Sequence, residues 1–278
     1  MRQLLTLLAC LFLAAASRGQ VSELGPTGGV SYYIGDLNPL KHYPKNTHFA
    51  GGLVFRYNFN DRYAFRLQGL YSKLEAYDSD SPDSLQLLRN LSFRTNLLEI
   101  SGLIEVNFFK YRSKGKDSRK WTPFVFVGFG YFRTNPQAQL DDTWYDLQPL
   151  GTEGQGTSSG EDYYKLDQLC MPFGTGLKFN FGKVDLQLEW GLRRTWTDHI
   201  DDVSGQYVDN AQLEFESGDL AAQLADRSVL RETGFNTGRA RGDVQTRDWY
   251  QYTGLTLTFL LTRFTECDEL YMNMGRRR

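Results

Sequence analysis

The chain has 278 residues, of which 41% are hydrophobic and 14% aromatic, and its formal net charge is -2. The near balance of 31 basic and 33 acidic residues gives no electrostatic surface for nucleic acid, and the apolar content excludes a disordered chain. The 27 glycines beside 19 Phe and 16 Tyr favour β-structure, because glycine weakens helices whereas aromatic rings need burial or an interface.

The first residues have the pattern of a secretory signal peptide. Arg2 gives a positive start, residues 4–16 form an apolar run too short to span a membrane, and small residues supply a cleavage site. We therefore expect residues 1–19 to be removed on export and residues 20–278 to form the barrel described below. Lipoprotein-type cleavage at Cys10 is the less favoured alternative. Two cysteines remain, Cys170 and Cys267, and both are interpreted as free.

Alternation of apolar and polar residues with a period of two follows along the chain. In residues 62–74, Tyr63 and Leu67 fall on one face and Arg66 on the other, which is the pattern of a strand with one apolar side. Three more segments repeat this pattern clearly and four are weaker but compatible with it. The eight predicted strands are residues 23–34, 48–59, 62–74, 97–109, 122–133, 173–181, 184–196 and 249–260.

The connections between these strands differ in length. Residues 60–61 and 182–183 are two-residue turns, whereas residues 75–96, 134–171 and 197–248 are long. Outer-membrane barrels place short turns at the periplasmic rim and long loops outside, and a sheet in hydrocarbon must close because no backbone group can stay unpaired. We predict an all-β fold, an eight-stranded antiparallel transmembrane β-barrel in the cell outer membrane, surrounded by lipid. A soluble β-sandwich is the alternative.

The two faces of the predicted strands lead to two further expectations. Polar residues on the inner face mix both signs, so we expect a lumen crossed by paired charges rather than an open pore. Aromatic residues near strand ends fit the interfacial girdle of a membrane barrel. The candidate lumen charges are Arg66, Glu99, Glu105, Lys178, Asp185, Glu189 and Arg193. The candidate girdle residues are Tyr63, Tyr71, Trp190, Trp196, Trp249, Tyr250 and Tyr252.

Several local patterns resemble a known family. These are Glu23-Leu24-Gly25 with Gly28-Gly29, Tyr32-Tyr33 and Gly35-Asp36-Leu37-Asn38-Pro39, then Phe55-Arg56-Tyr57-Asn58-Phe59, and Asp201-Asp202-Val203-Ser204 with Tyr207-Val208-Asp209. In order and spacing they resemble the PorG family of outer-membrane barrels in the type IX secretion system. The resemblance implies a barrel that holds the periplasmic ring proteins PorK and PorN at the outer membrane. The insert at residues 219–241 is larger than that family leads us to expect.

Titratable residues cluster just beyond the seventh predicted strand, at Asp198, His199, Asp201 and Asp202. Such a cluster at an outer rim could activate water for hydrolysis, with contributions from Asp141, Asp142 and Asp248. A calcium site at Asp201, Asp202 and Asp209 is a second possibility, although the twelve-residue loop pattern is missing. The favoured interpretation is a loop whose short Asp side chains cap backbone amides. We therefore predict no catalytic, cofactor or metal residues.

Three other loop features are interpreted as structural. His42 and His48 have no third ligand nearby and are expected to be solvated. Residues 151–160 (GTEGQGTSSG) lack the Gly-Lys-Ser/Thr ending of a phosphate loop and are expected to be flexible. Residues 217–232 are the one convincing helical stretch, with Ser217 as its cap, and we expect this helix to lie over the barrel mouth.

A basic turn and a charged C-terminal tail, which also carries Arg276, Arg277 and Arg278, are the substantial surfaces predicted on the periplasmic side. We interpret both as candidate partner-binding segments in a non-enzymatic membrane anchor. Their residues are Lys110, Arg112, Lys114, Lys116, Arg119 and Lys120 in the turn, and Glu266, Asp268 and Glu269 in the tail at about 262–278. The alternatives are a stand-alone structural or ligand-binding barrel and, less favoured, a hydrolase with its site at the rim.

Overall fold

The computed structural model describes residues 21–38, 44–111, 119–158 and 160–261. The predicted signal peptide, His42, the middle of the basic turn and the predicted tail with Cys267 lie outside these residues. The described chain contains ten strands, three α-helices and four single turns of 3-10 helix. No helix among the described residues is long and apolar enough to span a membrane.

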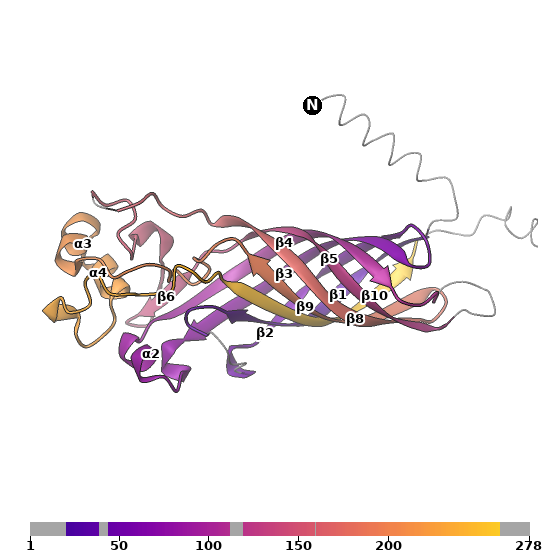
Figure 1. Ribbon diagram of the computed structural model, residues 1–278, viewed down its shortest axis with the longest axis horizontal. Coiled ribbons are helices and arrows are strands. Elements are labelled where there is room, and N and C mark those ends of the chain that lie inside the picture. The colour runs from indigo at the N-terminus through magenta and orange to yellow at the C-terminus, as the bar shows by residue number, and fades with distance from the viewer. Residues whose placement is uncertain (1–20, 39–43, 112–118, 159, 262–278) are drawn as a thin grey trace, which may run out of the picture.

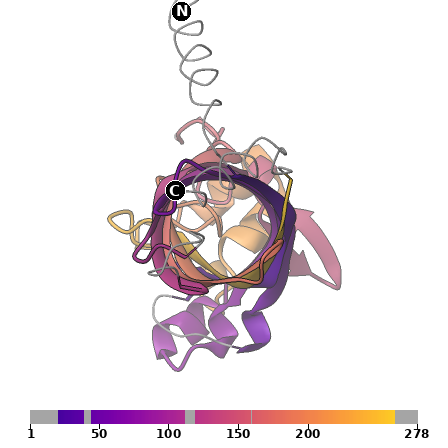
Figure 2. The ribbon, with the colours of Figure 1, turned by 90° about the vertical axis from the view of Figure 1, so that its right-hand side faces the viewer.

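Eight long strands build the body of the molecule. They are β1 (Val21–Ile34), β2 (His48–Asn58), β3 (Tyr63–Tyr77), β4 (Ser92–Asn107), β5 (Trp121–Arg133), β8 (Asp167–Asn180), β9 (Val184–Thr195) and β10 (Trp249–Leu260). Each strand pairs antiparallel with the next one, and β10 pairs with β1 from Glu23↔Leu260 to Ile34↔Trp249. The sheet is therefore a closed eight-stranded antiparallel barrel, as predicted, and Figure 2 shows it as a ring.

The two rims of the barrel differ, as the connection lengths predicted. One rim carries the short connections 59–62, 108–120 and 181–183, and the other carries the long loops 35–47, 78–91, 134–166 and 196–248. Gly182 adopts a φ of 89° in its tight turn, a conformation that favours glycine. The long loops extend the molecule well beyond the barrel at one end (Figure 1).

The long loops contain secondary structure that the sequence did not predict. A hairpin of β6 (Gln137–Leu140) and β7 (Thr143–Asp146) continues the sheet from β4 through the single pair Arg94↔Gln137. The short helix α2 (Ser84–Arg89) begins at Asp83, whose side chain accepts a hydrogen bond from the Leu85 amide. Three strands are also longer than predicted at this end, because β3, β4 and β8 continue past the alternating pattern.

The predicted helix at 217–232 was wrong in its bounds and its cap. The structure has α3 (Asn210–Ser217), capped by Asp209, and α4 (Asp219–Ala225), so Ser217 ends one helix instead of starting the other. Gly218, with a φ of 92°, separates them. Apolar residues of α4 pack against Ala138 of β6 and against Leu147, which follows β7. Viewed along the barrel, these helices lie behind the ring opening (Figure 2).

Large apolar side chains on every barrel strand point outward and are exposed. One example from each strand, in chain order, is Leu24, Leu53, Leu67, Ile100, Phe129, Leu177, Trp190 and Leu255. Water disfavours a continuous apolar band of this kind, whereas lipid chains cover it, and the closed ring leaves no barrel edge unpaired. The chain is therefore a membrane-spanning β-barrel of the outer-membrane type.

The aromatic girdle was predicted only in part. Tyr63, Tyr71, Trp190 and Trp196 are exposed on the outer face. Tyr250 and Tyr252 instead point into the barrel and are buried, which corrects their prediction. The physical reason is the period of two: these tyrosines share the inner face, where Tyr250 donates a hydrogen bond to Glu99 at 2.9 Å.

Candidate functional site

The seven candidate lumen charges all lie inside the barrel. Their side chains are buried, with exposures of 0 to 3%. Buried charges need partners, because an isolated ion loses its hydration without compensation. The inner faces of β3, β4, β8 and β9 supply these residues, which are Arg66, Glu99, Glu105, Lys178, Asp185, Glu189 and Arg193.

Glu105 is the centre of the lumen network. Its carboxylate lies 2.5 Å from Lys178 Nζ, 2.8 Å from Arg56 Nε and 3.1 Å from Arg66 Nε. Arg66 also pairs with Glu189. The network thus joins inward residues of β2, β3, β4, β8 and β9, and it ties strands that are not neighbours in the sheet.

The network continues towards both rims. Arg193 lies 3.5 Å from both Glu189 and Glu99 in the direction of the long loops. At the other end, Arg56 Nη1 donates to Glu23 at 2.8 Å. Arg56 and Glu23 belong to the patterns that resemble the PorG family, but they were not predicted to be lumen charges. Arg56 had the necessary signal, because it alternates with the outward residues Phe55 and Tyr57.

Aromatic rings of β5 fill the rest of the lumen, and glycines on β8 leave room for them. Phe124 and Phe126 of β5 point inward, with Lys178 Nζ 4.5 Å from the first ring centroid and Arg66 Cζ 4.7 Å from the second. A Cβ atom at Gly174 would lie 2.8 Å from the Phe126 ring, and one at Gly176 would lie 2.5 Å from the Phe124 ring. The glycines of β8 therefore leave the space that the phenylalanine rings of β5 occupy. Because the cations of the network are fully buried, they do not line a water-filled pore.

A second polar cluster lies beyond the barrel, where the long loops meet. Tyr33, at the end of β1, has its hydroxyl 2.6 Å from both Asp201 Oδ2 and Asp248 Oδ1. The Ile200 amide donates to Asp248 and the Val203 amide donates to Asp201. Gly35 makes room for this arrangement, since a Cβ atom there would lie 1.9 Å from the Tyr33 hydroxyl. We call Tyr33, Asp201 and Asp248 the carboxyl clamp.

One hydroxyl proton cannot serve two carboxylates at once. Tyr33 donates its hydrogen to one of them, so the other must carry its own proton and donate it to the phenol oxygen. Burial, together with the neighbouring carboxyl groups, raises the pKa of Asp201 and of Asp248 well above the ordinary Asp value. The carboxyl clamp therefore holds a proton that an exposed Asp pair would have lost.

The other acidic residues of this region have separate partners. Asp202 accepts hydrogen bonds from Thr152 and from Tyr164, the latter at 2.6 Å, and its Oδ2 lies 3.6 Å from Arg241 Nη2. Burial raises the pKa of Asp202 to about 6. Asp198 accepts from Ser204 Oγ at 2.8 Å, and burial raises the pKa of Asp198 to about 7. The bonds of Asp202 to Thr152 and Tyr164 connect the loop after β9 to the loop after β5.

The residues considered for hydrolysis do not form a catalytic dyad. His199 stacks on Tyr164 with ring centroids 4.5 Å apart, and its Nε2 lies 4.0 Å from Glu153. Burial lowers the pKa of His199. Within the described chain, no hydrogen bond joins His199 to Asp198 or to Ser204. Asp141 and Asp142 are exposed at the turn between β6 and β7, with φ values of 47° and 62°.

The residues considered for calcium are also kept apart. Asp209 caps α3 by accepting a hydrogen bond from the Ala211 amide, while Asp201 bonds to Tyr33 of β1 and Asp202 to Thr152 of the loop after β5. In the ranges that the structure describes, no three His, Cys, Asp or Glu side chains are arranged to hold a metal ion. His48 lies 2.7 Å from Glu75, so it contacts a carboxylate where the sequence predicted a solvated side chain.

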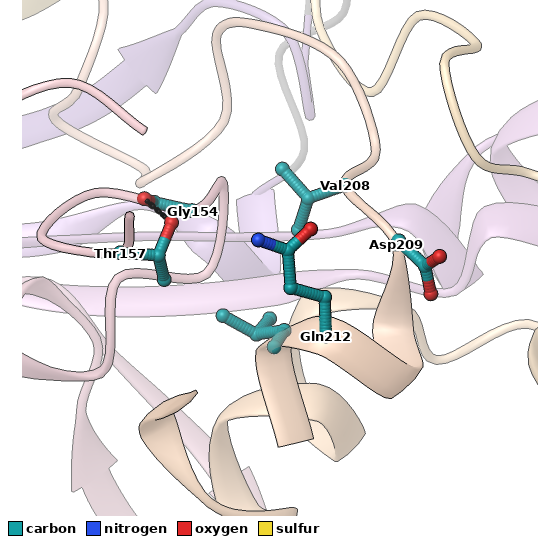
Figure 3. Close-up of a pocket in the computed structure, with 6 residues that line it drawn as sticks. Gly154, Thr157, Val208, Asp209 and Gln212 are labelled. Atoms are coloured by element: carbon teal, nitrogen blue, oxygen red, sulfur yellow. Dashed lines mark hydrogen bonds between the residues drawn. The ribbon is translucent and has the colours of Figure 1, made fainter. Parts of the chain in front are cut away.

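The first half of the glycine-rich segment, residues 151–155, is packed against other loops, which corrects the prediction of a flexible loop for that half. Thr152 is fully buried, and Gly151, Gly154 and Gly156 have positive φ values of 61° to 84° that only glycine adopts readily. Figure 3 shows Gly154 and Thr157 facing Gln212 of α3. The crevice between them has a volume of about 10 Å³, which is the space of one water molecule.

At the rim of short turns, the structure describes part of the predicted partner-binding set. Lys110, Arg119 and Lys120 are exposed there, and the Arg119 guanidinium stacks 4.1 Å from the Phe109 ring centroid. Tyr111 turns back into the barrel and donates a hydrogen bond to Asp185 at 3.2 Å. Arg112, Lys114, Lys116, Glu266, Asp268 and Glu269 lie outside the described residues.

Residues 2–226 match the family described as "Domain of unknown function (DUF6089)". The chain belongs to the DUF6089 family. No curated protein matches the chain. The PorG family, which the sequence patterns resemble, is not established by these comparisons.

Several solved outer-membrane barrels are similar in fold to this DUF6089 chain. Neisserial surface protein A is 9% identical with a TM-score of 0.40, over 87% of this chain and 99% of its own. Ail of Yersinia pestis is 8% identical with a TM-score of 0.39, over 87% and 97%. OprG of Pseudomonas aeruginosa is 12% identical with a TM-score of 0.34, over 86% and 95%.

Proposed function

We propose that this barrel is a non-enzymatic outer-membrane component of the type IX protein secretion system, and that it anchors or stabilises the periplasmic ring proteins PorK and PorN. The observation that carries the proposal is the position of the segments that resemble the PorG family. The segment from Tyr32 to Asn38 and the segment from Asp201 to Asp209 are far apart in the sequence, yet they meet at the carboxyl clamp. Both segments therefore supply residues that hold the long loops together at the carboxyl clamp.

The filled lumen directs the function to the two ends of the barrel. Arg56, Arg66, Lys178 and Arg193 are fully buried and are bound to carboxylates, so solutes have no path along them. A barrel without a pore can still hold another protein at the membrane. The short-turn rim faces the periplasm in an outer-membrane barrel, which puts the basic turn on the side of the ring.

The geometry of the basic turn suits a contact surface. The Tyr111 side chain enters the barrel and donates a hydrogen bond to Asp185, and the Arg119 amide donates to the Lys110 carbonyl at 3.0 Å. Both ends of the turn are therefore fixed to the rim. Exposed lysine and arginine side chains on a fixed base can pair with acidic groups of a partner at little additional ordering cost. The tail residues Glu266, Asp268 and Glu269 belong to the proposal from the sequence alone, because they lie outside the described residues.

The test is reversal of charge in the basic turn. Lys110, Arg119 and Lys120 would each be replaced with Glu, and the barrel would be purified from detergent-extracted outer membranes. We expect PorK and PorN to co-purify with the unchanged barrel and to be lost with the variant. The matched control is Arg133→Glu, an exposed arginine at the opposite rim.

Three outcomes would count against the proposal. Unchanged co-purification of the ring with the charge-reversed barrel would show that the basic turn is not the contact, and absence of the ring from the unchanged barrel would favour a stand-alone structural or ligand-binding barrel. Loss of cellular function on His199→Ala, with the ring still attached, would favour a rim hydrolase.

A further inference from the structure

An apolar groove lies on the long-loop side of the molecule, away from the proposed ring contact. One wall is α2, with Leu85 and Leu88, and the other is the segment 228–240, with Val229 and Phe235. The groove has a volume of about 520 Å³, large enough for several side chains of a ligand. Exposed apolar patches of this kind mark interaction sites on soluble surfaces.

Lipid tails do not reach this groove. Tyr71 is the last exposed apolar residue on the outer face of β3, and beyond it Lys73 Nζ pairs with Glu75 at 2.6 Å. The six residue-to-residue steps from Tyr71 to Tyr77 cover about 20 Å of strand, or about 14 Å along the membrane normal at a tilt near 45°. Helix α2 begins beyond Tyr77, so the groove stands above the lipid-covered band.

The charges around the groove favour an acidic ligand. Arg89, Arg239 and Arg241 line it, and none of the described lining residues is acidic. Arg89 is neutralised by Asp78 at 2.7 Å and Arg241 by Glu153 at 3.0 Å. Arg239 stacks on Phe235, with Cζ 3.7 Å from the ring centroid, and makes no ion pair within the described residues. This arrangement offers one available cation beside apolar walls.

The openness of the walls distinguishes a polypeptide from a small molecule. Sites for small ligands enclose most of the ligand surface, whereas here Leu85 is 73% exposed and Val229 is 86% exposed. A groove with open sides accommodates an extended segment that continues past both ends. We propose that this groove binds a polypeptide segment of another protein outside the membrane, through large apolar side chains next to a carboxylate that pairs with Arg239.

The experiment selects peptides on the intact barrel. The full chain would be reconstituted in lipid nanodiscs and exposed to a displayed library of random heptapeptides, with empty nanodiscs as the counter-selection. We expect the enriched peptides to carry an Asp or Glu beside aliphatic or aromatic residues. The best peptide would then be synthesised together with its amide counterpart, in which the acid is replaced by Asn or Gln.

Binding of these two peptides to variants tests the assigned contacts. Arg239→Gln should raise the Kd of the acidic peptide about tenfold, because a charge-assisted bond is lost, and it should leave the amide peptide unaffected. Val229→Asp should abolish binding of both peptides. Val229 is almost fully exposed, so the barrel still folds, as its heat-modifiable gel migration would verify. The matched control Arg133→Gln should change neither Kd.

Three results would overturn the proposal. The first is a selection that enriches no peptide over empty nanodiscs. The second is an enriched peptide whose Kd is changed neither by Arg239→Gln nor by Val229→Asp. The third is binding of laurate, a small anionic amphiphile, at this groove when no peptide binds. None of them affects the ring proposal, because the groove and the basic turn are at opposite rims.

Discussion

The proton held by the carboxyl clamp makes the outer loops sensitive to pH. When the loop 196–248 opens, Asp201 and Asp248 become exposed and titrate with a pKa near 4. In the closed state their pKa values are raised, so the closed state binds more protons than the open state above pH 4. The free energy that keeps the loop closed therefore falls as pH rises, by about 1.4 kcal/mol per pH unit for each extra proton.

Hydrogen exchange measures this opening directly. The amides of Ile200 and Val203 donate to the two carboxyl groups at 2.8 and 2.9 Å, so their exchange reports the clamp. After correction for the intrinsic pH dependence of exchange, their protection factors should fall as the pH rises above the open-state pKa near 4, by about tenfold per pH unit for each extra proton. Amides in the middle of β4 should keep constant protection over the same range.

An isosteric substitution removes the proton and keeps the hydrogen bonds. In Asp201→Asn the amide group donates permanently to the cluster, so Asp248 stays ionised and the closed state needs no extra proton. We expect the pH slope of the Ile200 amide to disappear, even though Asp36 and Arg89 still lie near Asp201 and Asp198 lies near Asp248. An unchanged slope in this variant, or a flat profile in the unmodified protein, would show that the clamp holds no additional proton.

Further substitutions test the lumen and the close approaches of the backbone. Glu105→Gln leaves three buried cations without their shared carboxylate and should lower the free energy of unfolding by about 3 to 5 kcal/mol. The exposed control Glu232→Gln should lower it by less than about 1 kcal/mol. The urea midpoint of unfolding in lipid vesicles measures both changes. Gly176→Ala should reduce the fraction of heat-modifiable barrel, because its Cβ would lie 2.1 Å from the Leu188 carbonyl oxygen, while Gly69→Ala, with no atom within 4 Å of its Cβ, should not. Gly35→Ala should displace the Tyr33 hydroxyl and abolish protection of the Ile200 amide while the barrel stays folded, and preserved protection would contradict the role given to this glycine.

The barrel strands were predictable because lipid and lumen impose opposite demands on alternate residues. Leu67 and Arg66 are neighbours on β3, yet one is exposed to lipid and the other is fully buried among charges. From the sequence, this contrast predicted which residues of β3, β4 and β9 face the lipid and which face the lumen. Where aromatic residues follow one another, as at Trp249, Tyr250 and Tyr252, the alternation gave no direction, and the girdle prediction failed for Tyr250 and Tyr252.

The outer loops were less predictable because distant contacts determine their structure. Helix α2 has six residues and no buried side chain, so its sequence has no apolar periodicity that would predict a helix. The sequence did identify Asp198, His199, Asp201 and Asp202 as a cluster. It did not reveal their partners, since Tyr33 is 168 residues from Asp201 and Thr152 is 50 residues from Asp202. Only the closed ring brings these segments together.

The most direct test of the account asks what covers the outer apolar face. Fluorophores attached through Leu67→Cys, Ile100→Cys and Leu188→Cys would be compared with one at Val229→Cys, in vesicles of brominated lipid and with acrylamide in the water. The account predicts strong quenching by brominated lipid at the three strand positions and quenching by acrylamide alone at Val229. Equal access of acrylamide to all four positions would contradict a membrane-spanning barrel.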